Sequence, residues 1–345
     1  MPKRDIIVIG ASAGGINALI DLLGSLPPQF DSSIFIVQHT SPYSKSQLPV
    51  ILSRCTSMKV MHAKDGEKIR SGQIYVAPPD HHLILEEGRL VVKKGPKENR
   101  FRPSIDTLFR SAAYVYGSRV IGIVLSGLLN DGTSGLWAIK RLGGTTIIQD
   151  PADAIFPEMP ENALEYVEVD HIEPVSKMSD LLQALTAHEP PATPEITAEE
   201  MKLMKTEVVI ASRDNAFEMG IMHMGEISPF TCPECHGALI SLKEGKAVRY
   251  RCHTGHAFSA STLLAGVTTT VEESLWNAMR ALEETTMLLE QIGNSFRDTG
   301  NAAASKKFFE KAEQTRERAR IIHDSVFTQE LISEDLRYDK DRGKQ

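Results

Sequence analysis

The chain of 345 residues has no apolar run that approaches the roughly 18 residues needed to cross a bilayer. Its first residues, MPKRDIIVIG, enter a strand-like run directly, without the long apolar segment and cleavage site of a signal peptide. Positive charge is not in excess, since the formal net charge is −7, and this gives no overall electrostatic case for binding nucleic acid. We therefore expect a cytoplasmic protein without membrane insertion or a nucleic-acid partner.

Cysteine is scarce, and the four cysteines of the chain favour metal binding in a reducing compartment over a disulfide framework. Cys232 and Cys235 form a CxxC knuckle, and Cys252 would add a third thiolate. The fourth ligand is His253 or His256, and we prefer His256 because it can reach back over a short turn. Such a ligand set favours a structural zinc ion with no open position for catalysis. The alternative is that these residues bind nothing.

Short β-branched runs alternate with helix-like segments from Asp5 to about Pro174, which predicts a parallel sheet with crossover helices. The fold class is then α/β, doubly wound and Rossmann-like. The stretch at 81–95 contains two alternating segments around Glu87 and Gly88, which predicts an antiparallel hairpin. The runs of the parallel part are residues 6–10, 33–38, 73–78, 120–127 and 145–150.

The rest of the chain changes character twice. Three prolines and several acidic residues at 188–202 indicate a linker. From Val271 apolar residues step by fours and threes, DTGN at 298–301 interrupts them, and the stepping then resumes, which predicts a helical hairpin. Self-association through these helices is the alternative to an intramolecular hairpin core. The predicted boundaries are 1–178 for the α/β domain, 179–225 for the linker, 226–262 for the zinc-ribbon-like module, 263–335 for the hairpin and 336–345 for a charged tail.

The turn GASAGG, between a strand and a helix, suits two functions. A dinucleotide loop would have glycine at Gly10, at position 12 and at Gly15, but the middle position is Ser12. That fold would also place an acidic residue near the end of the second strand, where this chain has His39. A hydroxyl at a helix N-terminus, beside the free amide of Ala13, suits acyl transfer instead. The alternative is that Ser12 only caps the helix.

His39 and Asp131 also follow predicted strands, so parallel pairing brings both to the carboxyl edge of the sheet together with Ser12. In a serine hydrolase the histidine takes the proton of the serine, and the aspartate fixes the tautomer of the histidine. Taken singly, His39 reads as a structural histidine and Asp131 as a turn aspartate. Their joint position at strand ends favours a triad.

The motifs GASAGG, VQH, RPSIDTLFRSAA, LSGLLNDGTSGL and QDPADAIFPEMPENAL resemble, in order, the catalytic domain of the chemotaxis protein-glutamate methylesterases, the CheB family. The resemblance covers about residues 1–175. It implies Ser12 as nucleophile, His39 as general base and acid, and Asp131 as the orienting carboxylate. The implied reaction is hydrolysis of glutamate methyl esters on receptor helices, and often glutamine deamidation, with no cofactor for catalysis. The amide of Ala13 and the backbone near Leu128 would form the oxyanion hole.

Departures from the family pattern lie at the active-site rim. The family often has threonine at Ala13, methionine at Leu128 and glycine at Glu158, before a Met-Pro pair.

The catalytic strand begins at Asp5, so we expect no receiver domain before it. Arg102 would lie near an acidic substrate, although the stretch RPSID also reads as an ordinary helix start.

The expected substrate is a methylated helical receptor or another signalling protein. The competing hypothesis is a non-enzymatic signalling adaptor. In that case the esterase-like domain would dock on partners, while the metal module and the helical hairpin would mediate assembly.

Overall fold

One parallel sheet forms from the β-branched runs of the N-terminal half. Its seven strands are hydrogen-bonded in the order β3-β4-β2-β1-β7-β8-β9, and every pair among them is parallel. The three central strands are buried along their whole length, which explains why their sequences do not alternate. The bounds are β1 (Ile6–Ala11), β2 (Ser33–Gln38), β3 (Lys59–His62), β4 (Gln73–Val76), β7 (Val120–Val124), β8 (Thr145–Gln149) and β9 (His171–Glu173).

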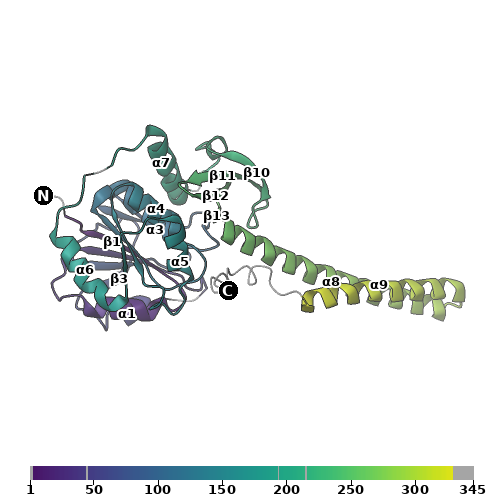
Figure 1. Ribbon diagram of the computed structural model, residues 1–345. Helices are drawn as coiled ribbons and strands as arrows, with labels where there is room; N and C mark the ends of the chain where they lie inside the picture. Colours follow the sequence, from purple (N-terminus) through teal and green to yellow (C-terminus); the bar gives the residue numbers. More distant parts are fainter. Residues whose placement is uncertain (1–2, 44–45, 193, 214–215, 329–345) are drawn as a thin grey trace, which may run out of the picture. The chain divides into compact units, whose positions relative to one another are not determined.

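The structure, a computed structural model, describes residues 3–43, 46–192, 194–213 and 216–328, and it divides into two compact units, Met1–Leu263 and Leu264–Gln345. In the first unit, helices cover both faces of the sheet (Figure 1). Helices α1, α2 and α6 pack on the face that includes Ile7, and α3, α4 and α5 pack on the face that includes Val8. The predicted doubly wound α/β fold is therefore confirmed. The helices are α1 (Gly15–Ser25), α2 (Leu48–Leu52), α3 (Ile105–Tyr116), the 3-10 helix η1 (Gly117–Arg119), α4 (Thr133–Arg141), α5 (Glu158–Tyr166) and α6 (Val175–Ala187).

The predicted hairpin forms a separate two-stranded sheet, β5 (His82–Glu86) and β6 (Arg89–Lys93). The strands are antiparallel, with Glu86 opposite Arg89. Gly88, the second residue of the turn, takes a φ of 69°, in the left-handed region that glycine enters without strain. The loop that follows this hairpin, up to the start of α3, supplies most of the contacts described below.

Helix α7 (Ala198–Arg213) lies within the segment 179–225 that the sequence indicated as a linker. One face of the helix is buried, through Met204, Glu207, Ile210 and Ala211, and it packs on α3 and on the β5–β6 hairpin. The composition of 188–202 is that of a linker, and it concealed the helical spacing that begins just after it. A short 3-10 helix, η2 (Ile221–His223), then leads into the cysteine-containing module predicted at 226–262.

That module is a four-stranded antiparallel sheet, β10 (Glu226–Thr231), β11 (Ala238–Glu244), β12 (Ala247–Cys252) and β13 (Ala257–Ser259). Its own apolar cluster is small and includes Leu239, Phe258 and Leu263 together with two cysteines. So little apolar surface cannot stabilise a separate fold, and other interactions must hold the module in place.

A buried network of charges joins the module to the α/β domain. The carboxylates come from the loop before α3, from α7 and from β11, and the guanidinium groups come from α3 and β12. All these side chains are at most 6% exposed. Arg251 lies between two carboxylates, with its Nη2 at 2.6 Å from Glu98 and at 2.6 Å from Glu207. The members are Glu98, Arg110, Glu207, Glu244, Arg249 and Arg251.

The arginines keep the buried carboxylates of this network ionised. Burial alone would raise the pKa of Glu207, but the charges of Arg251, Arg249 and Arg110 outweigh it and lower that pKa to about 2. The same balance holds the pKa of Glu98 well below its ordinary value. The network therefore consists of charged groups that depend on one another for solvation.

The second unit consists of helix α8 (Ala260–Asp298) from Leu264 onward and helix α9 (Ala302–Thr328). The predicted break falls between them, at Gly300 with a φ of 80°. Phe296 stacks on Phe308 with ring centroids 5.4 Å apart, and Arg316 pairs with Glu290, so the helices form an antiparallel hairpin. The predicted charged tail, 336–345, lies outside the described residues. Among the described helices, none combines the length and the apolar character that a membrane span needs.

Replacement of Arg251 by methionine is expected to lower the free energy of unfolding by about 3–5 kcal/mol. The change leaves Glu98 and Glu207 without the guanidinium that lies between them. Urea unfolding of the full chain measures the loss. Lys93→Met removes a partner of the exposed Asp65 and should cost less than about 1 kcal/mol. Equal costs for both variants would contradict this account of the network.

Candidate active site

Ser12 lies directly after β1, in a turn that only small residues allow. Gly14 has a φ of 72° and is the N-cap of α1, whose N-terminus receives no side-chain cap. Ser12 therefore does not cap α1, and the alternative of a purely capping serine is wrong. A Cβ on Gly127 would lie 2.8 Å from the Cβ of Ser12 and 2.0 Å from the sulfur of Met159, so this close approach requires glycine.

The three predicted residues meet at the carboxyl edge of the sheet. His39 follows β2, and its Nδ1 lies 3.2 Å from Ser12 Oγ, while its Nε2 lies 2.9 Å from Asp131 Oδ2. An ionised carboxylate can only accept a hydrogen bond, so Nε2 carries the proton and Nδ1 presents a lone pair to the hydroxyl. The His39 side chain is 5% exposed and that of Asp131 is fully buried. This geometry suits removal of the Ser12 proton.

Asp131 accepts hydrogen bonds from several groups besides His39. Its Oδ2 also accepts from the amide of Ile105 at 2.7 Å. Its Oδ1 accepts from the Asn99 amide nitrogen at 2.9 Å, from the Ser104 hydroxyl at 2.9 Å and from the amide of Asp106 at 3.2 Å. Burial alone would raise the pKa of Asp131, but the hydrogen bonds from His39 and Asn99 outweigh it and lower this pKa. Asp131 is therefore held as a charged, fixed acceptor.

Asp106 is a second buried carboxyl group behind Asp131. Its Oδ1 accepts from the amides of Gly132 at 3.0 Å and Gly135 at 2.7 Å. Burial and the negative charge of Asp131 raise the pKa of Asp106 to about 7. Asp106 therefore holds a proton for part of the time near neutral pH, which reduces repulsion between the two carboxyl groups.

A stacking contact on one face of the imidazole ring also holds His39 in place. The ring of Phe101 stacks on it with centroids 3.7 Å apart and an angle of 8° between the planes. Both rings form part of the wall of a hollow of about 300 Å³ beside the triad. Four basic side chains also line this hollow: Lys94, Lys97, Arg100 and Arg102.

Arg102, the predicted substrate contact, has several protein partners. Its Nε and Nη2 donate to Asp80 Oδ1 at 2.8 and 2.7 Å, and its Nη1 donates to the carbonyl of Gly95 at 2.7 Å. Its side chain is 16% exposed and borders the hollow. Arg102 therefore orders the wall of the hollow, and its contact with a substrate stays a prediction.

The predicted oxyanion donors lie at the rim. Neither the amide of Ala13 nor that of Leu128 donates a hydrogen bond within the described part of the chain. Leu128 is 38% exposed, and the next residue, Leu129, has a φ of 63°. Glu158, the third departure from the family pattern, begins α5, and the amide of Met159 after it donates to the Gly127 carbonyl at 3.1 Å.

The module gathers Cys232, Cys235, Cys252 and His256, whose donor atoms all lie within 4.8 Å of one another. The sulfur atoms of Cys235 and Cys252 are 3.6 Å apart, and His256 Nδ1 lies 3.7 Å from Cys232 and 3.6 Å from Cys252. Tetrahedral zinc with zinc–sulfur bonds of about 2.3 Å needs ligand separations of about 3.8 Å, so the donor set fits zinc. His253 is not in this cluster, and its ring lies against Gly237 instead.

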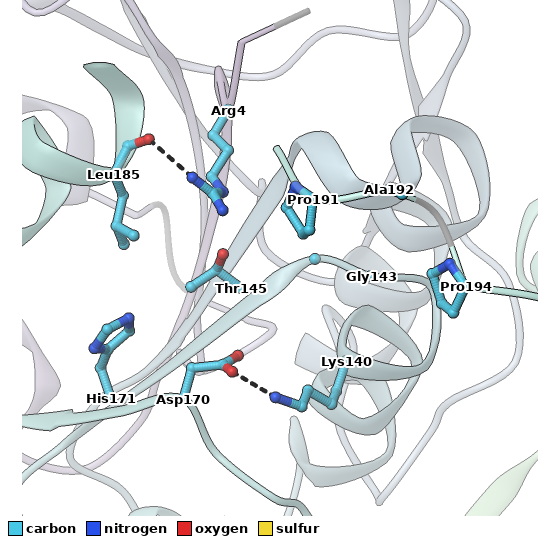
Figure 2. Close-up of a pocket in the computed structure, with 11 residues that line it drawn as sticks. Arg4, Lys140, Gly143, Thr145, Asp170, His171, Leu185, Pro191, Ala192 and Pro194 are labelled. Atoms are coloured by element: carbon cyan, nitrogen blue, oxygen red, sulfur yellow. Dashed lines mark hydrogen bonds and ion pairs between the residues drawn. The ribbon is translucent and has the colours of Figure 1, made fainter. Parts of the chain in front are cut away.

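Figure 2 shows residues that line a second hollow, of about 360 Å³. Arg4 before β1 and Thr145 at the start of β8 are among its residues, which places it at the amino ends of the strands. Lys140 pairs with Asp170 there, and Arg4 donates to the carbonyl of Leu185 at 3.4 Å. Ser12, His39 and Asp131 are not among the residues that line this hollow.

The sequence interpretation missed four residues around the triad. Asn99, Phe101 and Ser104 contact His39 or Asp131, and Asp106 lies behind them. Only RPSID, which contains Ser104 and Asp106, stood out in the sequence, and it was weighed only as a substrate contact or a helix start. Asn99 and Phe101 belong to an irregular loop that gives no periodic signal.

Comparisons with known proteins identify the relatives of this chain. Residues 7–182 match the family model described as CheB methylesterase. A Leptospira interrogans protein named "Putative protein-glutamate methylesterase/protein-glutamine glutaminase" is 42% identical over 51% of this chain and 92% of its own length. An Anaeromyxobacter dehalogenans protein-glutamate methylesterase/protein-glutamine glutaminase is 38% identical over 53% of this chain and 54% of its own length. The crystal structure of the Thermotoga maritima CheB methylesterase catalytic domain matches 52% of this chain and 98% of that domain, with 34% identity and a TM-score of 0.51.

Replacement of Asp131 by asparagine is expected to lower the reactivity of Ser12 by about 10³- to 10⁴-fold. The new amide nitrogen would donate toward His39 Nε2 and favour the tautomer with the proton on Nδ1, which cannot take the Ser12 proton. The rate of labelling by a fluorophosphonate measures the reactivity. Asp65→Asn, at a half-exposed carboxylate, is the control and should label like the wild type. Equal rates for Asp131→Asn and wild type would remove Asp131 from the site.

Proposed function

The chain belongs to the CheB methylesterase family, and we propose that Ser12, His39 and Asp131 form the triad with which it hydrolyses glutamate methyl esters on a helical signalling protein. The observation that carries this assignment is the pair of hydrogen bonds at His39, one to the Ser12 hydroxyl and one to the buried Asp131. The names of the relatives, which include protein-glutamine glutaminase, extend the proposal to deamidation of glutamine.

Acylation starts at the Ser12 hydroxyl. His39 Nδ1 takes its proton while Oγ attacks the carbonyl carbon of the ester, and Asp131 stabilises the imidazolium that forms. The tetrahedral intermediate collapses when Nδ1 returns the proton to the leaving oxygen and methanol departs. With a glutamine side chain the leaving group is ammonia.

Deacylation repeats the same steps with water. His39 Nδ1 removes a proton from the water that attacks the acyl-serine, and the second intermediate releases a glutamate side chain and restores Ser12. We assign stabilisation of both oxyanions to the amides of Ala13 and Leu128, which flank Ser12. Side chains, backbone amides and water supply this chemistry, so the proposal needs no cofactor at the triad.

The hollow beside His39 suggests the character of the substrate. Lys94 and Arg102 both pair with Asp80, and Lys97 pairs with Glu234, so this wall carries more positive than negative charge. A glutamate-rich helix would meet favourable potential here. This supports a methylated, acidic helical receptor as the substrate, with Arg102 as one contact.

Hydrolysis accounts for the site better than a non-enzymatic adaptor does. An adaptor needs a surface, but it does not need a serine hydroxyl hydrogen-bonded to a histidine whose other nitrogen faces a buried carboxylate. Partner binding by the α8–α9 hairpin is compatible with either function. Self-association through this hairpin stays a prediction.

We also propose that Cys232, Cys235, Cys252 and His256 bind one structural zinc ion. Four protein ligands complete a tetrahedral shell, so the ion would stabilise the turn that carries its ligands and would take no part in hydrolysis. Thiolate ligands require reduced cysteines, which supports the cytoplasm as the compartment.

Replacement of Ser12 by alanine is expected to lower methanol release by at least about 10³-fold, because the nucleophile is lost. The assay incubates the full chain with a methyl-labelled receptor fragment and counts released methanol. Ser53→Ala removes another hydroxyl, one that donates to a helix carbonyl, and should release methanol like the wild type. Equal release by Ser12→Ala and wild type, or none by the wild type, would overturn the proposed activity.

Replacement of Cys235 by serine is expected to remove about one zinc ion per chain from protein purified without added metal. Elemental analysis of the variant and the wild type measures the difference. His253→Ala, beside the cluster but outside it, should keep its zinc. Unchanged zinc in Cys235→Ser, or zinc lost only in His253→Ala, would contradict the ligand set.

A further inference from the structure

The side chain of Asn99 connects the triad to the module that contains the cysteines. It is 2% exposed. Its amide nitrogen donates to Asp131 Oδ1 at 2.9 Å and to Asp106 Oδ2 at 2.7 Å. Its amide oxygen accepts from the backbone amide of Ser259 at 3.0 Å and from the hydroxyl of Thr262 at 3.1 Å. All the hydrogen-bonding capacity of this buried group is thus divided between two aspartates, Asp131 and Asp106, and two residues at the end of β13 and the start of α8.

The module determines which way the Asn99 amide faces. A backbone N–H can only donate, so the amide oxygen must be the end that lies at Ser259. The nitrogen is then the end that lies at Asp131 and Asp106. A rotated amide would place its oxygen against the ionised carboxylate of Asp131 in a dry interior, which is an unfavourable contact between acceptors. The donors at Ser259 and Thr262 therefore keep a donor at the triad aspartate.

The same strand also holds the backbone of the loop around Asn99. The amide of Ala257 donates to the Lys97 carbonyl at 3.2 Å, and the Asn99 amide donates to the Ala257 carbonyl at 2.7 Å. Asn99 and Arg100 have φ values of 51° and 72°, which a loop keeps only when its surroundings impose them. Phe101, two residues on, stacks on His39. Both the histidine and the aspartate of the triad are therefore positioned by a loop whose backbone is hydrogen-bonded to β13.

The metal-ligand turn leads directly into this strand. His256 precedes Ala257, and its carbonyl accepts from the Cys252 amide at 3.0 Å. The Ser259 hydroxyl also donates to Asn130, the neighbour of Asp131, at 2.6 Å. A metal ion on His256 and Cys252 would fix the start of β13, and β13 in turn fixes both asparagines beside the triad aspartate.

We propose that Asn99 is a positioning residue for the triad and that the metal-loaded Cys/His module holds it in place, so that the module controls acyl transfer at Ser12 without touching the substrate. This inference rests on the proposed function of the triad. It assigns to the C-terminal module a role in catalysis through three contacts: Ala257 with the loop backbone, and Ser259 and Thr262 with the Asn99 amide.

Thr262→Val tests the hydroxyl alone, because valine keeps the shape of threonine. Loss of the hydroxyl removes a neutral hydrogen bond to Asn99 and the bonds of the same oxygen to the backbone of Ser259. It is expected to lower kcat for methyl-ester hydrolysis about 3- to 10-fold. KM should not change, because Thr262 is not at the hollow, and the rate of fluorophosphonate labelling of Ser12 should fall by the same factor. Thr262→Ser should recover most of the lost kcat. The control is Thr268→Val, which removes a hydroxyl that donates to the Leu264 carbonyl within the same helix.

Asn99→Ala removes the whole connection and is expected to lower kcat about 10- to 100-fold, the range for hydrogen bonds to charged groups. Zinc content should stay at about one ion per chain in Asn99→Ala and Thr262→Val. A purely structural role would change the urea midpoint and leave kcat per folded molecule unchanged. Wild-type kcat in both variants would overturn the proposal.

A third experiment tests the role of the metal ion, with Cys235→Ser and hydrogen–deuterium exchange of the full chain. Loss of metal is expected to reduce protection of the peptide that covers 97–101, and the labelling rate of Ser12 should fall with it. Zn²⁺ added to chelator-treated wild type should restore both. Unchanged protection and unchanged labelling in zinc-free protein would overturn the role of the metal. If wild type labels with fluorophosphonate but releases no methanol, the proposed substrate fails, and the labelling rates still decide this inference.

Discussion

An ionised carboxylate in a dry interior is the constraint on which the site depends. Asp131 must stay charged to keep the proton of His39 on Nε2, yet it is fully buried, so its oxygens need protein donors in place of water. Those donors come from the loop before α3 and from the first turn of α3, at Asn99, Ser104 and Ile105. The Asn99 backbone is left-handed, with a φ of 51°, and strand β13 holds it there through the hydrogen bond from the Asn99 amide to the Ala257 carbonyl.

The buried ion pairs fix the position of the module, and the hydrogen bonds to Asn99 fix the orientation of its side-chain amide. Ion pairs as buried as Arg251 with Glu98 contribute little net stability, because desolvation offsets most of the attraction. Any other arrangement of the module would leave a buried charge without its partner, so the ion pairs make such arrangements less stable. Glu98 immediately precedes Asn99, so the network that fixes the module also fixes the residue before the triad's donor. A module with a small apolar cluster of its own is thereby held in one register against the α/β domain.

The sequence predicts the triad because the prediction needs only the order and direction of strands. Ser12, His39 and Asp131 each follow a parallel strand, and parallel strands end at one edge. Asn99 offers no such rule, since its partner Ser259 is 160 residues away and neither residue lies in a periodic pattern. Arg251 was missed for a related reason, because an arginine in a short strand reads as a solvent-facing residue until the facing carboxylates are known. Helix α7 was masked by the prolines just before it.

Coupling between a metal ion and a distant triad has to act in both directions. Suppose that metal bound at His256 favours the loop conformation in which Asn99 faces Asp131. Any state that needs this conformation then raises the affinity of the module for metal by the same factor. The tetrahedral intermediate is such a state, because Asp131 stabilises the imidazolium of His39 that forms with it. A zinc ion with a complete protein shell can therefore influence an esterase through the free energy of a loop, although its charge never reaches the carbonyl that reacts. This distinguishes it from a catalytic zinc ion, whose effect depends on an open coordination position.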